Sequence, residues 1–599
     1  MATSGGTIEI YSGVNDPTGQ ESGRVPDIIV REGAELDFSG GGIHYEAGTV
    51  EITGLVNGNT VTNIAEASPS GRYSAMANVW KNVPSFFSGS DAGTLRLVAP
   101  CIVLDGNLNG SVTVGPYQLY DDAEKANGLL SLLRPKAGTL ELGQEYNINQ
   151  ARTTRDAIQE SITIVESNTA LTDFTADDEL DSDRANVFSA EILNEAGLGT
   201  LKLTANTEFH QKQGADLELQ AGGELTVAAR RIVEEGKVYA PGGEVNFTLV
   251  ENLTSYDETD PRYKEQVDRF YLGPQAVIDV SGEQIDNRFL RDGEIINHGF
   301  LNGGSVTIKD WSDPVNGMIL AEGSRIDVGG GYEWSTDDDL EGGDAGSLSI
   351  TGDTLFLDGE MTGLALAGQT GGTLTLHASD VTVTSDPHRA VSGLNADSEL
   401  PIDKKGLVLS TGQLTDSGFT HINLKSVRDL VVERGVHLQP SHARLQPGSS
   451  TSSGRQPRYS AFSGSNSNAW QVQYSDDGRP LLDDLGASSI NLASGKNFTS
   501  GGLASFEITA LEKNRTLIER GAEITVGPKG AISVSGLGVE IDGVLDAPAG
   551  SVAVTATSTD ALVGTDALIL GEEARILAQG WNEPGSRPVS DLPRSHTPH

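Results

Sequence analysis

The sequence predicts an all-β chain folded as a right-handed parallel β-helix, or β-solenoid, with lateral loop and helical excursions. Three observations predict this class: a recurring phrase of small residues followed by alternating apolar and polar residues, the spacing between its copies, and a composition rich in glycine and poor in aromatic residues. Glycine adopts turn angles that other residues avoid, and the alternation places successive side chains on opposite faces of a strand. Because one such strand cannot bury its apolar face alone, the copies must stack.

The glycine phrase predicts a turn followed by a short strand wherever it occurs. Each copy starts with Gly-Gly or Ala-Gly and continues through four residues such as Thr-Leu-Thr-Leu. The copies lie at residues 5–10, 92–97, 222–227, 242–247, 303–308, 345–350, 371–376 and 549–554.

The spacing between apolar positions favours coils over hairpins. Hairpin arrays repeat about every 8 to 12 residues, whereas one coil of a solenoid needs roughly 20 or more. The intervals in this chain are Leu225–Val245 (20 residues), Val306–Ile326 (20), Ile326–Leu348 (22) and Leu348–Leu374 (26).

Two further strand classes lie between the glycine phrases. One class occurs at residues 33–40, 274–282 and 323–330, and the other at residues 104–108, 357–361 and 541–545. Two or three short strands per coil, joined by Gly, Asp and Asn turns, are typical of a parallel β-helix.

Composition and charge limit both the core and the partners. The chain has 599 residues, of which 37% are hydrophobic and 6% aromatic, and 73 glycines, which predicts a long, thin core of small aliphatic side chains. Its formal net charge of -43 repels nucleic acid and anionic membranes, so neither is an expected partner. Solubility explains the charge, with loose binding of divalent cations as the alternative. The sequence contains no run of 18 apolar residues, so it is not predicted to span a membrane.

Three stretches break the coil pattern. Residues Asp156–Val165 are compatible with a short helix, and an acidic run follows over Asp173–Asp183, for which calcium coordination is a minority interpretation. The second stretch is a lateral loop at about 251–270. The third, at about 436–480, is rich in Ser, Gly, Pro and Gln and cannot bury enough apolar surface to offset its ordering entropy. The predicted organisation is coils over 1–150, a helical and acidic excursion over 151–190, coils over 191–435 with a lateral loop at about 251–270, a flexible loop over 436–480, coils over 481–585 and an unstructured end over 586–599.

Repetition argues that the recurring aspartates are structural. Asp37, Asp279 and Asp327 occupy equivalent places in their repeats, whereas a catalytic site is built once, so a turn role is predicted for all three. Cys101 is the only cysteine, which excludes an intramolecular disulfide and a thiolate metal site and favours an inert position in a strand.

No catalytic, cofactor-binding or metal-binding residue is predicted, and no cofactor. The acidic stretch 337–344 contains one imperfect copy of a calcium-binding Gly-Gly turn, and a solvated loop is the favoured interpretation. The histidines lack metal-ligand spacing, and nucleophile-elbow and phosphate-loop motifs are missing. Five Asn-x-Ser/Thr sites are interpreted as chance matches: Asn109, Asn246, Asn252, Asn497 and Asn514.

Longer phrases of the chain resemble the large exoproteins of the filamentous haemagglutinin family. The phrases are Gly-Gly-Ile-His-Tyr-Glu-Ala-Gly-Thr-Val at 41–50, Ile-Ala-Glu-Ala-Ser-Pro at 64–69, and Ala-Glu-Ile-Leu-Asn-Glu-Ala-Gly-Leu-Gly-Thr at 190–200, within a match over about 1–390 and 495–585. The resemblance implies a rod that is secreted and displayed on the bacterial cell surface. It also implies a partner, the outer-membrane β-barrel transporter of two-partner secretion.

The chain departs from the family pattern at its start. Residues 1–6 lack the basic and apolar stretches of a signal peptide, and the family's secretion domain is not recognisable. Residues 573–582 resemble a loop that leads into a further glycine strand. The sequence therefore predicts an internal fragment of the rod.

The predicted function is the non-enzymatic structural shaft of a secreted, surface-displayed adhesin that attaches to cells or surfaces. Host or neighbouring-cell glycans or surface proteins are the expected partners, and the first candidates for glycan stacking are Trp80, Tyr263, Trp334 and Trp470. The alternative is a β-helix polysaccharide lyase or hydrolase, which would need clustered carboxylates on one groove face. An enzyme would release products, whereas an adhesin would bind without product formation.

Overall fold

A computed structural model shows that the regular secondary structure of the chain is almost entirely β-strand, which confirms the predicted all-β class. The described residues are 3–12, 27–58, 60–64, 71–118, 133–143, 159–169, 180, 184–250, 268–290, 299–310, 317–386, 392–400, 406–415, 417–440, 445, 454–455, 488–494, 515–557 and 568–580. Within them the helices are short: α1 (Ala190–Glu195) and α3 (Thr411–Thr415). Neither helix in this described part is long and apolar enough to cross a membrane.

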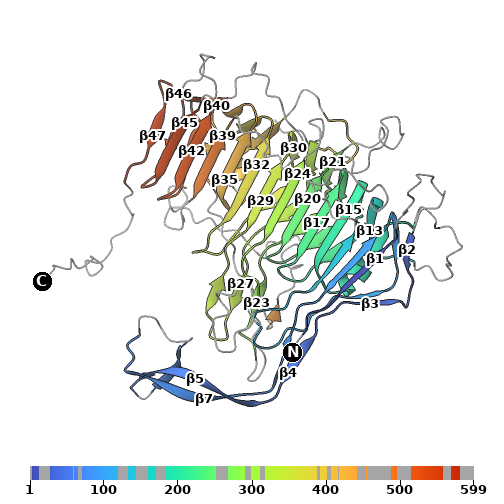
Figure 1. The fold of residues 1–599 in the computed structure, drawn as a ribbon. Coiled ribbons are helices and arrows are strands. Elements are labelled where there is room, and N and C mark those ends of the chain that lie inside the picture. The colour runs from blue at the N-terminus through green and yellow to red at the C-terminus, as the bar shows by residue number, and fades with distance from the viewer. Residues whose placement is uncertain are drawn as a thin grey trace.

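The first of three sheets contains all eight glycine phrases, as predicted, and its strands are parallel and in register (Figure 1). In spatial order they are β1 (Thr7–Tyr11), β9 (Thr94–Val98), β12 (Gly138–Leu142), β15 (Leu198–Gln211), β17 (Glu224–Ala229), β20 (Glu244–Leu249), β24 (Ser305–Asp310), β29 (Ser347–Thr351), β32 (Gly372–Ala378), β35 (Phe419–Ser426), β39 (Ser489–Ala493), β42 (Ala531–Gly536) and β45 (Ser551–Ala556).

The second sheet receives the chain after each first-sheet strand, and its pairings are also parallel. Its spatial order is β14 (Val187–Ser189), β13 (Gln159–Val165), the second half of β15, β18 (Arg231–Glu234), β21 (Arg269–Leu272), β25 (Gly317–Leu320), β30 (Thr354–Leu357), β34 (Leu407–Ser410), β33 (Val381–Thr384), β36 (Leu430–Val432), β40 (Arg515–Ile518), β43 (Gly538–Ile541) and β46 (Leu568–Leu570). The pair β2 (Asp27–Val30) and β10 (Cys101–Leu104) lies beside β14, where the amide of Asn186 donates to the Ile102 carbonyl at 2.9 Å.

The third sheet consists of three parallel groups of short strands. They are β3 (Glu35–Asp37) with β11 (Asn107–Asn109); β16 (Asp216–Glu218), β19 (Lys237–Tyr239), β22 (Val277–Asp279), β26 (Arg325–Asp327) and β31 (Glu360–Thr362); and β37 (His437–Leu438), β41 (Glu523–Thr525), β44 (Val544–Asp546) and β47 (Arg575–Leu577). One passage through the three sheets makes one coil, and the coils stack as the sequence predicts.

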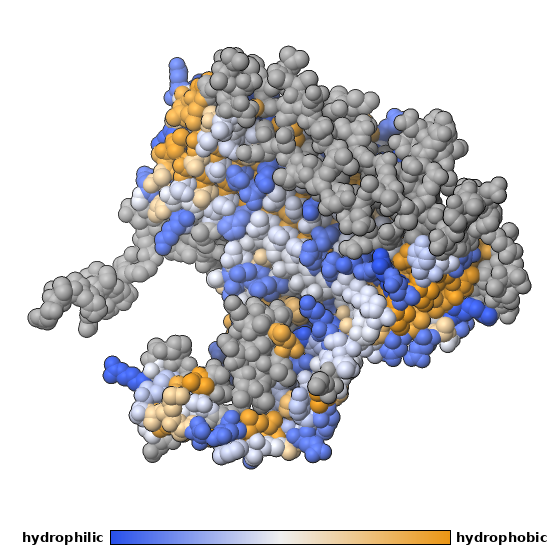
Figure 2. Space-filling view, viewed as in Figure 1, coloured by the Kyte–Doolittle hydropathy of each residue, from blue (hydrophilic) through white to orange (hydrophobic). Residues whose placement is uncertain are grey.

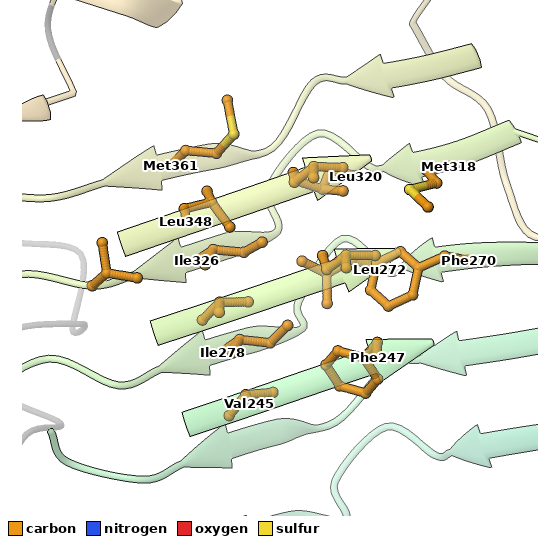
Figure 3. Close-up of a cluster of buried hydrophobic side chains, with 14 of the residues drawn as sticks. Val245, Phe247, Phe270, Leu272, Ile278, Met318, Leu320, Ile326, Leu348 and Met361 are labelled. Carbon is orange, nitrogen blue, oxygen red and sulfur yellow. The ribbon is translucent and has the colours of Figure 1, made fainter. Parts of the chain in front are cut away.

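The core lies between the sheets and is built from the inward side chains of each strand. Phe247 on β20 and Phe270 on β21 meet with ring centroids 5.3 Å apart, and Ile278 on β22 closes the third side of the same coil (Figure 3). All three side chains are buried, and the next coils repeat the arrangement with other aliphatic residues. Alternation with period two therefore produces one continuous apolar column along the rod.

Two strands of the second sheet are out of sequence order. The strand β14 lies between β10 and β13, and β34 lies between β30 and β33. Each is followed by a short helix, α1 or α3, which occupies one of the two gaps in the third sheet. The Asn194 side chain of α1 donates to Asp216 O and accepts from Glu218 N, both at 2.8 Å, and so pairs with β16 as a strand would.

The structure corrects several details of the predicted organisation. In the described part of Asp156–Val165, the chain forms strand β13 rather than a helix, because Ile162 and Ile164 alternate into the core and pair with β14 and β15. The excursion 151–190 therefore includes two strands of the rod. The interval from Val306 to Ile326 does not join equivalent positions of successive coils, because Ile326 lies on β26 of the third sheet. Val306 instead pairs with Leu348, 42 residues onward.

The loop predictions fall mostly on residues outside the described ones. Of the lateral loop 251–270, only its last residues are described, and they enter strand β21. Of 436–480, residues 436–440 belong to the rod through β37, and β38 (Gly454–Arg455) pairs with β23 (Gln284–Asp286). The buried Leu445 donates its amide to Ala365 O at 2.9 Å. This segment therefore contacts earlier coils.

Two projections leave the rod where the third sheet turns into the first (Figure 1). The arm, residues 42–89, is antiparallel and contains β4 (Gly42–Tyr45), β5 (Gly48–Asn57), β6 (Thr60–Asn63), β7 (Ala75–Val83) and β8 (Phe86–Gly89). The side sheet contains β23, β27 (Tyr332–Trp334), β28 (Leu340–Gly342) and β38. The prediction of coils over 1–150 is wrong for the arm.

Part of the outer face of the second sheet, from β18 to β30, is covered by residues 392–400, here called the strap. Its Leu394, Ala396 and Leu400 pack on a buried apolar cluster that includes Tyr271 and Phe356. At the coil that contains β45–β47, hydrophobic residues instead gather on the surface, among them Leu568–Leu570 (Figure 2).

Candidate functional site

A groove of about 1240 Å³ runs along the edge where the third sheet turns into the first. It forms because the turns before β15, β17 and β20 are short, whereas the connections before β12 and β24 are long and form its two sides. Its lining extends from Ala137 before β12 to Thr373 on β32. The interval of 20 residues between Leu225 and Val245 was the only sequence signal of these short turns.

The floor of the groove consists of glycine turns in close contact. Gly222 and Gly242 have φ of +74° and +58°, the left-handed region that favours glycine. The floor carbonyls already accept hydrogen bonds from the next coil, since Glu244 N donates to Gly223 O at 2.8 Å and Ser305 N donates to Gly243 O at 2.9 Å. A ligand would therefore meet side chains on this floor rather than free backbone groups.

One wall contains Arg134 and Lys136 and is fixed by the buried Gln118. The Gln118 Oε1 atom accepts from Gly89 N at 2.7 Å and from Gly115 N at 2.9 Å, and its Nε2 donates to Leu133 O at 3.2 Å. These bonds tie the base of the arm to both segments of the wall. Because a buried amide side chain makes them, the wall is held without a bound partner.

The opposite wall is the ring of Phe300, held by Glu283. Phe300 N donates to Glu283 Oε2 at 2.9 Å, and Glu283 N donates to Phe300 O at 2.6 Å. A Cβ added to Gly222 would lie 2.7 Å from the ring, so this glycine makes room for the phenyl group. The Arg134 guanidinium lies 5.1 Å from the ring centroid, at cation–π distance across the groove.

Two glutamates lie side by side on the floor. Glu224 and Glu244 are in register on β17 and β20. Glu224 Oε1 accepts from the Thr226 hydroxyl at 2.9 Å, and Glu244 Oε1 accepts from Asn246 Nδ2 at 2.8 Å. Each carboxylate keeps a second oxygen that can accept a hydrogen bond from a ligand.

The aromatic residues singled out from the sequence do not line this groove. Trp80 lies on the arm with 65% of its surface exposed. Trp334 lies on β27, half-buried, with the Arg288 guanidinium 4.2 Å from its ring centroid. Tyr263 and Trp470 lie outside the described residues. Phe300 was not predicted because a single aromatic residue in a loop gives no signal of its own.

The recurring aspartates make the turn contacts that the sequence predicts. In each case a carboxylate oxygen accepts from the amide two residues onward: Asp37 from Ser39 at 2.9 Å, Asp279 from Ser281 at 2.9 Å and Asp327 from Gly329 at 2.8 Å. The hydrogen bonds from Ser39 lower the pKa of Asp37 below its usual value. These carboxylates close the corner of each coil.

The acidic stretch 337–344 forms the exposed turn between β27 and β28 and the residues after it. Asp337 N and Asp339 N donate to the Ser335 hydroxyl at 3.1 and 3.0 Å, and Asp344 Oδ1 accepts from Thr370 N at 2.7 Å. Among the described residues, His, Cys, Asp and Glu nowhere form a group of three that could hold a metal ion. The acidic run Asp173–Asp183 lies outside the described residues apart from Leu180.

Cys101 lies on β10 and is half-buried. Burial, together with the nearby Asp27, raises the pKa of its thiol to about 11. The thiol therefore stays protonated at neutral pH, as expected of an inert position. Of the five Asn-x-Ser/Thr sites, Asn109 and Asn246 lie in strands β11 and β20, and Asn252, Asn497 and Asn514 are outside the described residues.

Compared with protein-family models, with curated proteins and with solved structures, the chain has no match. The fold class and the groove therefore rest on the sequence and the geometry alone.

Proposed function

We propose that this chain is a right-handed parallel β-helix that serves as the non-enzymatic shaft of a secreted, surface-displayed bacterial adhesin. The single observation that supports this most strongly is the architecture: one parallel sheet continues from β1 to β45, with projections on one edge. In such a stack each coil is held by its neighbours, so the rod resists local unfolding and carries its projections away from an attachment point.

The resemblance to the filamentous haemagglutinin family supports the same proposal. By this resemblance, the chain would be exported through an outer-membrane β-barrel transporter, and the rod would serve in attachment to cells or surfaces. The arm and the groove are two places where a partner would meet exposed side chains.

A glycan-cleaving enzyme is the second candidate, and one observation favours it. Glu224 and Glu244 form an in-register pair of carboxylates in a groove, and paired carboxylates are what glycoside hydrolysis requires. Each accepts a hydrogen bond within its own strand, however, and neither is buried. Glycoside hydrolysis typically needs one carboxyl group held in an apolar environment as the acid, so attachment remains the preferred function.

One experiment separates the two candidates. Beads coated with the purified chain are incubated with bacterial or host cells, and the same preparation is assayed for reducing ends or unsaturated products with a panel of polysaccharides. The adhesin proposal predicts saturable attachment without products. Product release would support the enzyme, and beads that attach no better than uncoated beads would contradict the adhesin.

A further inference from the structure

We propose that the groove binds an uncharged polysaccharide chain that lies along the axis of the rod. The inference rests on the proposed attachment function and names the ligand class and the site. It is supported by the shape of the groove, its charge, its repeating side chains and its fixed walls.

The groove has the shape of a site for an extended polymer. Its lining passes over β12, β15, β17, β20, β24, β29 and β32. With about 4.8 Å between neighbouring strands, this run is about 29 Å long. A pocket for a small molecule has a volume of roughly 300–1,000 Å³ and encloses its ligand, whereas this groove is larger and open.

The charges in the groove select against both polyanions and polycations. Arg134 and Lys136 on one wall balance Glu224 and Glu244 on the floor, although the whole chain has a net charge of -43. A sulfated or uronic polymer would face the two carboxylates, and a basic polymer would face the two cations. An uncharged chain avoids both penalties.

Side chains at equivalent places on successive strands suit a ligand with a repeating structure. Glu224, Glu244, Ser305 and Ser347 follow one another in register along the first sheet. They place carboxylate and hydroxyl groups at the strand spacing of about 4.8 Å. Each can exchange hydrogen bonds with the hydroxyls of a sugar unit. The Arg134 guanidinium lies over the Phe300 ring, so these two side chains together form the surface against which a sugar ring can pack.

A peptide fits the groove less well. Strand addition needs an open strand edge, but the floor carbonyls of Gly223 and Gly243 already accept from the next coil. Peptide binding is therefore one of the outcomes that would contradict the proposal.

The backbone of both walls is held in place before a ligand binds. Gln118 is 5% exposed and Glu283 is also 5% exposed, and their hydrogen bonds fix both sides of the groove. Binding to fixed walls loses less conformational entropy than binding to mobile ones.

The test is affinity electrophoresis of the full chain through gels that contain an uncharged polysaccharide, namely dextran, mannan or a soluble β-glucan, with heparin and polygalacturonate as charged comparisons. The variants are Phe300→Ala and the double variant Glu224→Ala/Glu244→Ala. Phe289→Ala is the matched control, since it removes a phenyl ring that is 49% exposed and not in the groove, and Trp80→Ala tests the arm as the alternative site. The double variant alters surface side chains only, so it keeps the test valid where Phe300→Ala disturbs folding.

The proposal predicts retardation by at least one uncharged polysaccharide, weakened about tenfold or more in both groove variants and unchanged in the control. Retardation only by charged polymers, no retardation by any polysaccharide, or preferential binding of peptides would overturn it. If Trp80→Ala alone abolishes both retardation and bead attachment, the site lies on the arm and the groove proposal is wrong, while the shaft function stands. Failure of the unchanged chain to attach to cells would instead contradict the proposed function itself.

Discussion

Replacement of Phe270 by Ala tests whether the coils are stabilised mainly by their immediate neighbours. Phe270 is 0% exposed and its ring meets that of Phe247 at 5.3 Å in the core (Figure 3). Truncation of a buried Phe typically costs about 3–5 kcal/mol, which includes the loss of an aromatic contact. Because each coil contacts only adjacent coils, we expect this loss to appear locally rather than along the whole rod.

Hydrogen exchange resolved by strand is the appropriate measurement. In Phe270→Ala, the amides of β18, β21 and β25 are expected to exchange roughly 10²- to 10³-fold faster or more, because each 1.4 kcal/mol corresponds to a factor of ten. The amides of β42 and β45, many coils away, are expected to exchange at the unchanged rate.

The control is Trp80→Ala, which removes an aromatic ring that is 65% exposed on the arm. Its expected effect is within about 0.5 kcal/mol. Acceleration of less than tenfold around Phe270, or equal acceleration in β42 and β45, would refute the reasoning.

Three further predictions concern contacts between coils. Gly346→Ala is expected to destabilise the β24–β29 region in thermal unfolding by more than 1 kcal/mol, because the new Cβ would overlap the carbonyl oxygen of the adjacent coil; an unchanged melting temperature would contradict this close approach. Complete burial raises the pKa of Glu234 well above its ordinary value of 4.5. Between the two pKa values the folded state holds a proton that the unfolded state has released. The contribution of Glu234 to stability is therefore greatest below about pH 4.5 and falls by about 1.4 kcal/mol per pH unit above it until the folded pKa is reached. The free energy of unfolding, measured with denaturant from pH 4 to 8, should show this fall in the unchanged chain and a flatter pH profile in Glu234→Gln. Equal pH profiles would mean that folding does not raise the pKa of Glu234. Arg269→Leu removes hydrogen bonds from its Nη1 to Asn395 O (3.2 Å) and Ala396 O (3.0 Å), so limited proteolysis should cut the strap 392–400 faster, with roughly 2–3 kcal/mol less protection. Resistance equal to that of the unchanged chain would show that the strap is held without Arg269, by apolar packing and the Arg231–Asp397 ion pair.

The first sheet could be predicted from the sequence because two local signals coincide on it. The glycine turn and the period of two recur together, and all eight copies lie on this one sheet. The third-sheet strands show the same alternation over only three residues. For this reason the sequence pattern groups Ile326 of the third sheet with Val306 and Leu348 of the first sheet. The phrase 104–108 spans the corner between β10 and β11, so it marks a turn and not a strand class of its own.

The out-of-order strands could not be predicted from local pattern. A three-residue strand such as β14 has little pairing preference of its own, and its place beside β13 depends on contacts distant in sequence. The sequence of β13 fits either a helix or a strand, and tertiary pairing decides between them. The antiparallel arm shows the same limit, because alternation indicates a strand but not the direction of its partner.

The groove was missed for a related reason. Its walls come from connections that are far apart in the chain, so Arg134 and Phe300 have no common motif. Only the short turns of its floor could be recognised in the sequence, from the interval of 20 residues between Leu225 and Val245.

The most direct test of the stacked coils is a disulfide between β24 and β29. Thr307 and Ser349 are in register on these neighbouring strands, 42 residues apart in sequence. The spacing of about 4.8 Å between strands falls within the Cα range of a disulfide. The double variant Thr307→Cys/Ser349→Cys is therefore expected to oxidise readily into an intramolecular bond while it keeps its far-UV spectrum. Failure of this pair to oxidise, with bond formation in the slipped pair Thr307→Cys/Thr351→Cys, would contradict the parallel, in-register stack.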